Sequence, residues 1–320
     1  MSRTGSQLAH DKTTAAPEAR RPRIVVIGSI NMDLVLPCAR LPVQGETLAA
    51  GALQLLPGGK GANQAVAAAR LGASVCMIGR VGNDTFGRQL CAGLSHDGVD
   101  TRYVRTTRNT PTGTASIFLQ KSGENSILLS SGANGKVTPA DVNAAKSVIR
   151  DADIVLLQLE LPLATVAHAI ALCRKLKVRT ILDPAPAVKL PEAFYEVDVL
   201  TPNEGEALVL AGGKTSSPQE TAKRLRKRGV KQVVLKLGAR GAMHDDGTIT
   251  NASGFRIKPI DTTAAGDAFT AAMGVGLAEG KEWPDVLRFA NGAGALTCTK
   301  IGAQPSLPTR KEVDRLANRK

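Results

Sequence analysis

The stretch DIVLLQLELPLATVAHAIALCRKLKVRTILD, residues 153–183, follows a strand–helix–strand pattern. Residues 153–160 form an apolar run typical of a buried strand, and residues 179–183 form another. Between them, apolar residues recur at helical spacing over 163–176. A unit of this kind predicts two parallel strands joined by a crossover helix.

The same alternation extends over most of the chain and predicts an α/β fold. Alternating strands and helices predict a doubly wound, mainly parallel sheet with helices on both faces. We expect further strands at 23–29, 74–82, 197–203 and 231–238, and further helices at 61–72, 218–229, 266–280 and 285–299.

Two stretches, 32–57 and 109–131, interrupt this alternation. They lack helical spacing and carry Pro, Gly and alternating apolar residues, so they predict a small β-sheet inserted as a lid beside the main sheet. We expect a disordered basic tail at 1–22, a main domain at 23–308 and a C-terminal helix or tail at 309–320.

Composition narrows the class of protein. The chain has 320 residues, of which 43% are apolar, enough for one large core with an insertion. No apolar run approaches the roughly 20 residues that cross a bilayer, and residues 1–22 lack the apolar core of a secretory signal. Five scattered cysteines without a CxxC or a metal-ligand spacing indicate reduced core thiols. We therefore expect a cytoplasmic protein with no membrane partner.

The net charge of +13 favours an anionic ligand such as a nucleotide. Part of this charge lies on one face of the helix expected at 218–229, in AKRLRKRG at 222–229. With 3% aromatic residues and no nucleic-acid-binding motif, a nucleic acid is not the expected partner. The sequence also contains no Walker A loop, no GxGxxG after a strand and no HExxH.

The segment DTTAAGDAF, residues 261–269, places small residues and one carboxylate where an apolar helix begins. Small residues at such a turn leave backbone N–H groups facing outward, and the helix dipole adds positive potential. This arrangement suits a phosphoryl group. Asp267 beside that anion hole fits a general base that accepts a proton from a nucleophile. An ordinary first-turn Asp, stabilised by the helix dipole, is the alternative.

Two further segments, GSINMDLV at 28–35 and GGKGANQA at 58–65, carry polar groups suited to a polyol. Asn31 and Asp33 alternate on an extended segment, so both point to one side, where an amide and a carboxylate pair with adjacent hydroxyls. The glycines of the second segment permit close backbone approach, and Lys60 and Asn63 add donors at a helix start. A tight glycine turn with a surface Lys is the alternative.

Two strand-end loops complete the set. TPNEGE, 201–206, supplies Asn203 and Glu206 as hard oxygen ligands for Mg²⁺ or its waters, although a helix-capping Asn explains the same residues. KLGARG, 236–241, is a glycine loop of the kind that borders a nucleotide, and alone it is a weak signal.

Together and in this order, these segments resemble the ribokinase branch of the PfkB carbohydrate-kinase family. GGKGANQAVAAARLG (58–72) and DTTAAGDAF match the two family signatures, and LLQLE (156–160), DPAPA (183–187) and TPNEGE match the segments between them. GSINMD (28–33) and GAQPS (302–306) are closer to ribokinases than to fructokinases or adenosine kinases. The likeness runs from about residue 23 to 308.

The resemblance implies ATP-dependent phosphorylation of D-ribose at its O5 hydroxyl. It implies that Asp267 is the catalytic base and that Ala264, Ala265 and Gly266 form the anion hole. The ribose positions that it implies are Asn31, Met32, Asp33, Gly59, Lys60, Gly61, Ala62, Asn63, Glu160 and Asp267. The ATP positions are Asn203, Lys236, Leu237, Gly238, Ala239, Arg240, Gly241, Gly266, Asp267 and Asn291.

The resemblance also implies a K⁺ site at Asp261, Thr263, Thr297, Lys300, Gly302 and Ser306, several of them through carbonyls, and Mg²⁺ held through water at Asn203 and Glu206. Because two lids pair in ribokinases, it implies a homodimer. The chain departs from some ribokinases by having Asn291 in place of His, and the basic tail has no family counterpart.

Two alternatives stay open. One is a sibling kinase of the same family that acts on deoxyribose, another sugar or a nucleoside. The other is a catalytically silent protein that binds a nucleotide or a nucleic acid through its basic surface.

Overall fold

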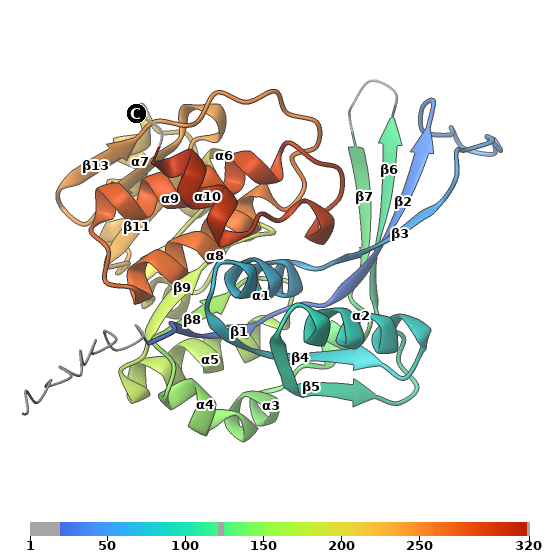
Figure 1. The fold of residues 1–320 in the computed structure, drawn as a ribbon, viewed down its shortest axis with the longest axis horizontal. Coiled ribbons are helices and arrows are strands. Elements are labelled where there is room, and N and C mark those ends of the chain that lie inside the picture. Colours follow the sequence, from blue (N-terminus) through green and yellow to red (C-terminus); the bar gives the residue numbers. More distant parts are fainter. Residues whose placement is uncertain (1–19, 121–124, 319–320) are drawn as a thin grey trace, which may run out of the picture.

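A computed structural model describes residues 20–120 and 125–318 of the chain. Most of the predicted tail, residues 1–19, lies outside the described residues. The described chain forms a three-layer body of helices on both faces of a sheet, and a second, smaller sheet projects from one side of it (Figure 1). Within the described ranges, no helix has both the length and the apolar character needed to cross a membrane.

The main sheet has nine strands in the order β13-β12-β11-β10-β9-β8-β1-β4-β5. All neighbours from β10–β11 through to β4–β5 are parallel, whereas β12 and β13 add antiparallel strands at one edge. The predicted mainly parallel sheet is thus confirmed. The strands are β1 Arg23–Ile27, β4 Ser74–Gly82, β5 Val99–Thr107, β8 Ile154–Leu157, β9 Arg179–Leu182, β10 Val199–Leu200, β11 Gln232–Lys236, β12 Ala242–Asp245 and β13 Ile249–Ala252.

Helices cover both faces of this sheet, and alternate strand residues contribute to two separate cores. In β1, Ile24 and Val26 pack into one core, while Val25 and Ile27 pack into the other. The first core is closed by helices α1 Lys60–Arg70, α2 Thr85–His96, α8 Ala265–Ala278, α9 Trp283–Thr297 and α10 Arg310–Ala317. The second is closed by α3 Pro139–Ala144, α4 Lys146–Arg150, α5 Leu163–Leu176, α6 Glu204–Leu210 and α7 Pro218–Lys227.

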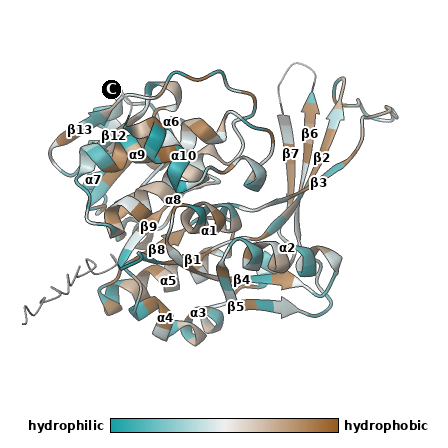
Figure 2. Cartoon of the chain, viewed as in Figure 1, coloured by the Kyte–Doolittle hydropathy of each residue, from teal (hydrophilic) through white to brown (hydrophobic). Residues whose placement is uncertain are grey.

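The smaller sheet has four strands in the order β3-β2-β6-β7 and confirms the predicted lid. Its strands are β2 Asn31–Cys38, β3 Gln54–Gly58, β6 Gly113–Gln120 and β7 Asn125–Ser130. Strand β2 follows β1 after a short turn, so the lid begins directly at the end of a central strand of the main sheet. Apolar residues occur along its strands (Figure 2).

Several elements differ from the sequence prediction. The sequence pattern did not predict α2 or β5, and β5 lacks an apolar run because it is an edge strand with charged residues such as Asp100, Arg102 and Arg105. The predicted strands 153–160 and 197–203 are shorter, at Ile154–Leu157 and Val199–Leu200. Regular strand pairing ends at Leu157 and Leu200, although Asn203 still forms an isolated parallel bridge with Lys236.

Helix α1 begins unusually close to the turn after β1. The N–H of Ala62 donates to the carbonyl of Ser29 at 2.9 Å. A Cβ atom at Gly61 would lie 2.6 Å from the Cα of Gly28, and one at Gly28 would lie 2.7 Å from the Cα of Gly61. Only glycine at both positions allows this approach, which brings the first turn of α1 to the carboxyl end of the sheet.

We predict that Gly61→Ala destabilises the fold by roughly 1–3 kcal/mol, because the added methyl group meets backbone that has no room to move. Denaturant unfolding measures the change in the free energy of unfolding. Gly93→Ala in α2 is the matched control, since a Cβ there enters open space, and helix propensity predicts a gain of roughly 0.5–1 kcal/mol. Equal effects of the two variants would contradict the role of the close contact.

Candidate active site

The predicted site residues meet at the carboxyl ends of the parallel strands. Strand β1 lies between β4 and β8, so the strand order reverses there, and doubly wound folds bind ligands in the crevice expected at such a point. Glu160 follows β8, Asp183 follows β9, and Lys236 ends β11. Helices α1 and α8 bring Asn63 and Asp267 to the same place.

Asp267 lies in the first turn of α8 and is 5% exposed. Its Oδ2 accepts a hydrogen bond from Asn63 Nδ2 at 3.0 Å, and its Oδ1 accepts one from Gln64 Nε2 at 3.3 Å. Burial raises the pKa of Asp267 to about 6, against the opposing positive charge of Lys60. The carboxylate is therefore ionised at neutral pH but closer to its pKa than an exposed Asp, as suits a general base.

The backbone N–H groups around Asp267 lie at the start of α8, where the helix dipole adds positive potential. Ala264 adopts a left-handed conformation, with φ of 60°, and no side chain caps α8. Among the described residues, the N–H groups of Ala264, Gly266 and Asp267 have no acceptor, whereas that of Ala265 donates to the carbonyl of Thr262 at 3.3 Å. Of the three predicted anion-hole N–H groups, those of Ala264 and Gly266 thus have no acceptor. The N–H group of Asp267, which was not predicted, has none either.

A second cluster of polar residues lies where β1 and β8 end and β2 begins. The carboxylate of Glu160 accepts hydrogen bonds from the Ser29 hydroxyl, from Asn31 Nδ2 at 3.5 Å and from the N–H of Lys60 at 3.3 Å. Asn31 and Asp33 lie on one face of β2, as predicted from their spacing. Of the other predicted ribose residues, Met32 points to the opposite face and Ala62 is fully buried, so these two pack rather than line the crevice.

Asp33 is 7% exposed, and no described residue donates a hydrogen bond to its carboxylate. Burial, followed by the nearby charges of Glu160 and Asp267, raises the pKa of Asp33 to about 7. Burial acts against the charge of Lys60, but Asp267, Asp183, Glu160 and Glu206 together raise its pKa above the ordinary lysine value. The carboxyl groups of Asp33, Glu160 and Asp267 therefore outnumber the single positive charge of Lys60 beside them.

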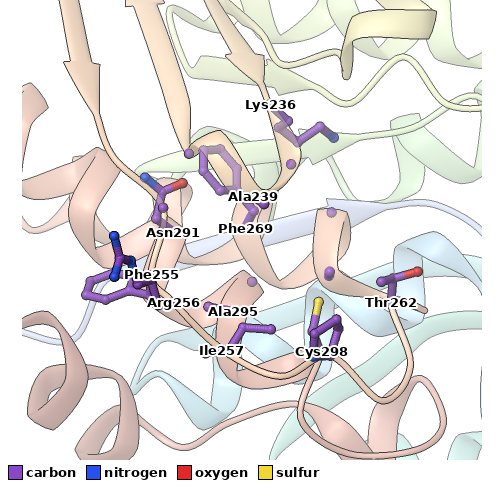
Figure 3. Close-up of a pocket in the computed structure, with 17 residues that line it drawn as sticks. Lys236, Ala239, Phe255, Arg256, Ile257, Thr262, Phe269, Asn291, Ala295 and Cys298 are labelled. Carbon is purple, nitrogen blue, oxygen red and sulfur yellow. The ribbon is translucent and has the colours of Figure 1, made fainter.

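A pocket of about 520 Å³ adjoins the free amides. Figure 3 shows side chains from β11, from the 254–259 segment and from α9 around this space. The predicted nucleotide residues Lys236, Gly238, Ala239, Gly241, Gly266 and Asn291 line it. Asn291 Nδ2 donates to the carbonyls of Ala252 and Ser253 at 3.1 and 3.3 Å, which holds one wall in place. Leu237 and Arg240 belong to the same loop but do not line the pocket, and Arg240 pairs with Glu204.

Asn203 and Glu206 form a capping box at the start of α6. The N–H of Glu206 donates to Asn203 Oδ1 at 2.9 Å, and the N–H of Asn203 donates to Glu206 Oε2 at 2.8 Å. Neither residue lines the pocket. The helix-capping alternative thus describes this pair in the structure, and one carboxylate oxygen of Glu206 is left for another ligand.

The predicted cation residues lie in the loop before α8, in the loop after α9 and, for Thr297, at the last residue of α9. Asp261 Oδ1 accepts from the N–H and the hydroxyl of Thr263, at 2.9 and 2.7 Å, and its Oδ2 accepts from the N–H of Gly302 at 2.8 Å. These hydrogen bonds lower the pKa of Asp261 in spite of burial, which acts in the opposite direction. Ser306 Oγ donates to the carbonyl of Ala303 at 2.7 Å. The ammonium of Lys300 points away to Glu312, at 3.4 Å.

Sequence reasoning missed several polar residues of the crevice, although they carry a recognisable signal. Asn134 holds Asn31 Oδ1 at 2.7 Å and also binds both backbone groups of Ile30. Gln64, Gln158 and Asp183 are buried and hydrogen-bonded around Asp267. Gln158 and Asp183 each interrupt or end an apolar strand, and this position at the carboxyl end of a parallel sheet was the available signal. No described residues form a group of His, Cys, Asp and Glu fit to hold a metal ion by themselves.

Comparison with known proteins gives one consistent result. A family model described as pfkB family carbohydrate kinase matches residues 21–310. The chain is 42% identical to a ribokinase of Bacillus subtilis over 295 residues, covering 92% of this chain and 98% of that protein. It is 40% identical to a ribokinase of Haemophilus influenzae over 297 residues, covering 91% and 97%. A solved structure of Arabidopsis thaliana ribokinase complexed with ribose and ATP superposes with a TM-score of 0.86 at 37% identity, covering 94% and 100%.

We predict that Asp33→Asn stabilises the free protein at pH 8 and that this gain is much smaller at pH 5. The folded pKa of Asp33 is raised, so between about pH 4 and 7 the folded state binds more protons than the unfolded state, and stability falls as the pH rises. The difference in the gain between the two pH values should be on the order of 2 kcal/mol in urea unfolding. A purely steric effect of the substitution would act at both pH values, so a pH-independent effect would contradict a buried, charged Asp33.

Proposed function

Because the chain belongs to the pfkB family of carbohydrate kinases, we propose that it transfers the γ-phosphoryl group of ATP to the O5 hydroxyl of D-ribose and forms D-ribose 5-phosphate. The observation that carries this proposal is the position of Asp267. Its carboxylate lies between a cluster of polyol-type partners and a nucleotide-sized pocket, beside unpaired backbone N–H groups.

In this reaction Asp267 accepts the proton of the attacking hydroxyl. Its pKa of about 6 leaves it ionised at neutral pH, and its hydrogen bonds from Asn63 and Gln64 fix both carboxylate oxygens. The free N–H groups of Ala264, Gly266 and Asp267 stabilise the charge on the transferred phosphoryl group. Because the transition state of phosphoryl transfer is loose, positioning contributes more than base strength.

The sugar binds on the lid side of Asp267. The carboxylates of Asp33 and Glu160 and the amide of Asn31 accept and donate hydrogen bonds to adjacent hydroxyls, and Lys60 and Asn63 add donors. The sugar would supply the donors that the carboxylate of Asp33 lacks in the free protein. Gly59, with a positive φ of 90°, and Gly61 keep the backbone of α1 close to this position.

The nucleotide occupies the neighbouring pocket, with its base near Asn291 and its phosphates directed to Lys236 and Gly266. The pocket is large enough for a nucleoside, and glycines in the 238–241 loop allow close backbone approach. Mg²⁺ bound through water fits the free oxygen of Glu206, an oxygen ligand of the type this ion prefers, and it would neutralise phosphate charge.

K⁺ fits the two loops that flank the anion hole. The possible ligand atoms are all oxygens. They are the Asp261 carboxylate, the Ser306 hydroxyl and the backbone carbonyls of residues 263, 297, 300 and 302. The ammonium of Lys300 does not compete, because it pairs with Glu312. A monovalent cation there would order the 261–264 turn. Asp261 already binds both loops through Thr263 and Gly302.

The basic surface of α7 gives little support to nucleic-acid binding. Arg224, Arg226 and Arg228 pair with Glu220, Asp245 and Glu192 respectively. All five cysteines are free thiols, which supports a reducing, cytoplasmic location.

The test of the proposed activity is ADP release with ATP, Mg²⁺ and a panel of sugars. Ribose should stimulate release, and Asp267→Asn should lower kcat by roughly 10²–10⁴-fold while ATP affinity stays nearly unchanged. Asp285→Asn, an exposed residue of α9, is the matched control and should turn over normally. Near-normal turnover by Asp267→Asn would show that Asp267 is not the base.

The same assay separates the alternatives. Turnover should be faster in K⁺ than in Na⁺, and ribose should be preferred to 2-deoxyribose because Asp33 would lose a hydroxyl partner. Preference for deoxyribose or a nucleoside would refute the ribose assignment and leave a sibling kinase. Nucleotide binding without any sugar-stimulated ADP release would leave a silent binding protein.

We further propose that two lids pair in a homodimer. Leu55, Ile127 and Leu128 of the small sheet are 48%, 54% and 69% exposed, which favours coverage by a second copy of the chain.

We predict that the protein sediments at twice the chain mass of 33.4 kDa and that the Leu128→Asp variant sediments at the single-chain mass. Val209→Asp, at an exposed apolar residue of α6, is the control and should stay dimeric. A wild-type protein at the single-chain mass would contradict the proposal.

A further inference from the structure

A chain of buried side chains connects the nucleotide pocket to Asp267. Lys236 Nζ donates to Asp183 Oδ1 at 2.8 Å, and Gln64 Nε2 donates to Asp183 Oδ2 at 3.2 Å. The same Nε2 donates to Asp267 Oδ1 at 3.3 Å. Gln64 and Asp183 are 0% and 1% exposed, neither lines the nucleotide pocket, and both polar atoms of each side chain bind other side chains of the protein.

The orientation of Gln64 is fixed by its partners. A glutamine amide nitrogen has two hydrogens, one for each of the two carboxylates. Its oxygen accepts a hydrogen bond from Gln158 Nε2 at 2.6 Å, so the reversed amide would place oxygen against two carboxylates. Gln158 in turn needs glycine at position 28, where a Cβ would lie 2.0 Å from its Oε1.

The other end of the chain reaches the phosphate side of the site. Lys236 lines the nucleotide pocket, and its ammonium lies 3.5 Å from the point that a Cβ of Gly266 would occupy. Gly266 carries one of the free N–H groups. The Asp183 carboxylate therefore holds the ammonium of Lys236 beside the anion hole. Through Gln64, it is also connected to the carboxylate of Asp267.

We propose that Asp183 and Gln64 are positioning residues for phosphoryl transfer: Asp183 fixes the ammonium of Lys236 beside the anion hole, and Gln64 fixes Asp267 relative to it. This inference rests on the proposed kinase function. The two buried residues would together hold the carboxylate of Asp267 and the ammonium of Lys236 at a fixed distance from each other.

Two opposite effects on Asp267 follow from this arrangement. The charged groups that face Asp267 are Lys60 on α1, Asp183 after β9, Glu160 after β8 and Asp33 on β2, with Lys236 on β11 beyond Asp183. The negative charge of Asp183 raises the pKa of Asp267, whereas a hydrogen bond donated to its carboxylate lowers the pKa. Loss of Asp183 and loss of Gln64 should therefore shift its titration in opposite directions.

The test compares Gln64→Met and Asp183→Asn with the wild type in pH profiles of kcat. Gln64→Met removes the donor at nearly constant volume, so the acidic limb should move up by about one pH unit. Asp183→Asn removes the charge, so the limb should move down. In Gln64→Met, kcat at pH 7.5 should fall roughly 10–100-fold while KM for ATP and sugar stays within about threefold, because the residue touches neither ligand.

Gln232→Met is the matched control, since Gln232 lies at the opposite end of β11 and contacts His244 at 3.2 Å. It should leave the acidic limb unchanged. Shifts of both test variants in the same direction, or no shift in either, would show that Gln64 and Asp183 only support the fold. If Asp183→Asn does not fold, the direction of the Gln64→Met shift, together with its unchanged KM, still decides between the two roles.

A second readout separates this inference from the proposed activity. Titration of the Asp267 carboxyl carbon by NMR, identified by its loss in Asp267→Asn, reports the same opposite shifts in the free protein. Opposite pKa shifts of Asp267 without sugar-dependent turnover would support the positioning role and refute the ribose kinase activity. Turnover with ribose but without opposite pKa shifts would support the kinase activity and refute the positioning role.

Discussion

The structure depends on keeping a carboxylate charged inside the protein. Asp267 is buried at the start of α8, among the acidic groups Asp33, Glu160 and Asp183. Such a charge is costly unless donors and a counter-charge compensate it. Lys60, Asn63 and Gln64 supply them, and all three lie in the first turn and a half of α1. The position of α1 is therefore as important to the site as Asp267 itself.

The position of α1 in turn follows from backbone packing. Gly28 and Gly61 let the helix begin against the turn after β1, at the point where the strand order reverses. The carboxyl ends of β8, β9 and β11 add Glu160, Asp183 and Lys236 around it. Strand β2 continues from β1 into the lid, so Asn31 and Asp33 connect the covering sheet to the floor of the crevice. One close helix–strand contact thus organises both ligand positions.

The sequence predicted the parts of this arrangement that depend on local pattern. Helix 163–176 has the predicted bounds, because its apolar spacing is regular, and the small residues before Asp267 correctly indicated an uncapped helix start. The positions of Asn31 and Asp33 on one face followed from strand geometry alone.

What sequence pattern missed depends on contacts between distant segments. Gln64 and Asp183 are 119 positions apart, and Asn134 reaches Asn31 across 103, so no local signal joins them. The hydrogen bond from the Ala265 amide to Thr262 was not predicted either, whereas the helix-capping role of Asn203 was one of the two explanations that the sequence left open. Strand β5 was missed because an edge strand with charged side chains has no apolar run.

The decisive experiment for the role of Asp267 is a crystal structure with D-ribose and a non-hydrolysable ATP analogue. We expect the O5 hydroxyl within about 2.6–3.2 Å of an Asp267 oxygen and the γ-phosphate facing the N–H groups of Ala264 and Gly266. A sugar whose terminal alcohol lies away from Asp267, or amides turned toward the protein's own carbonyls, would contradict that role.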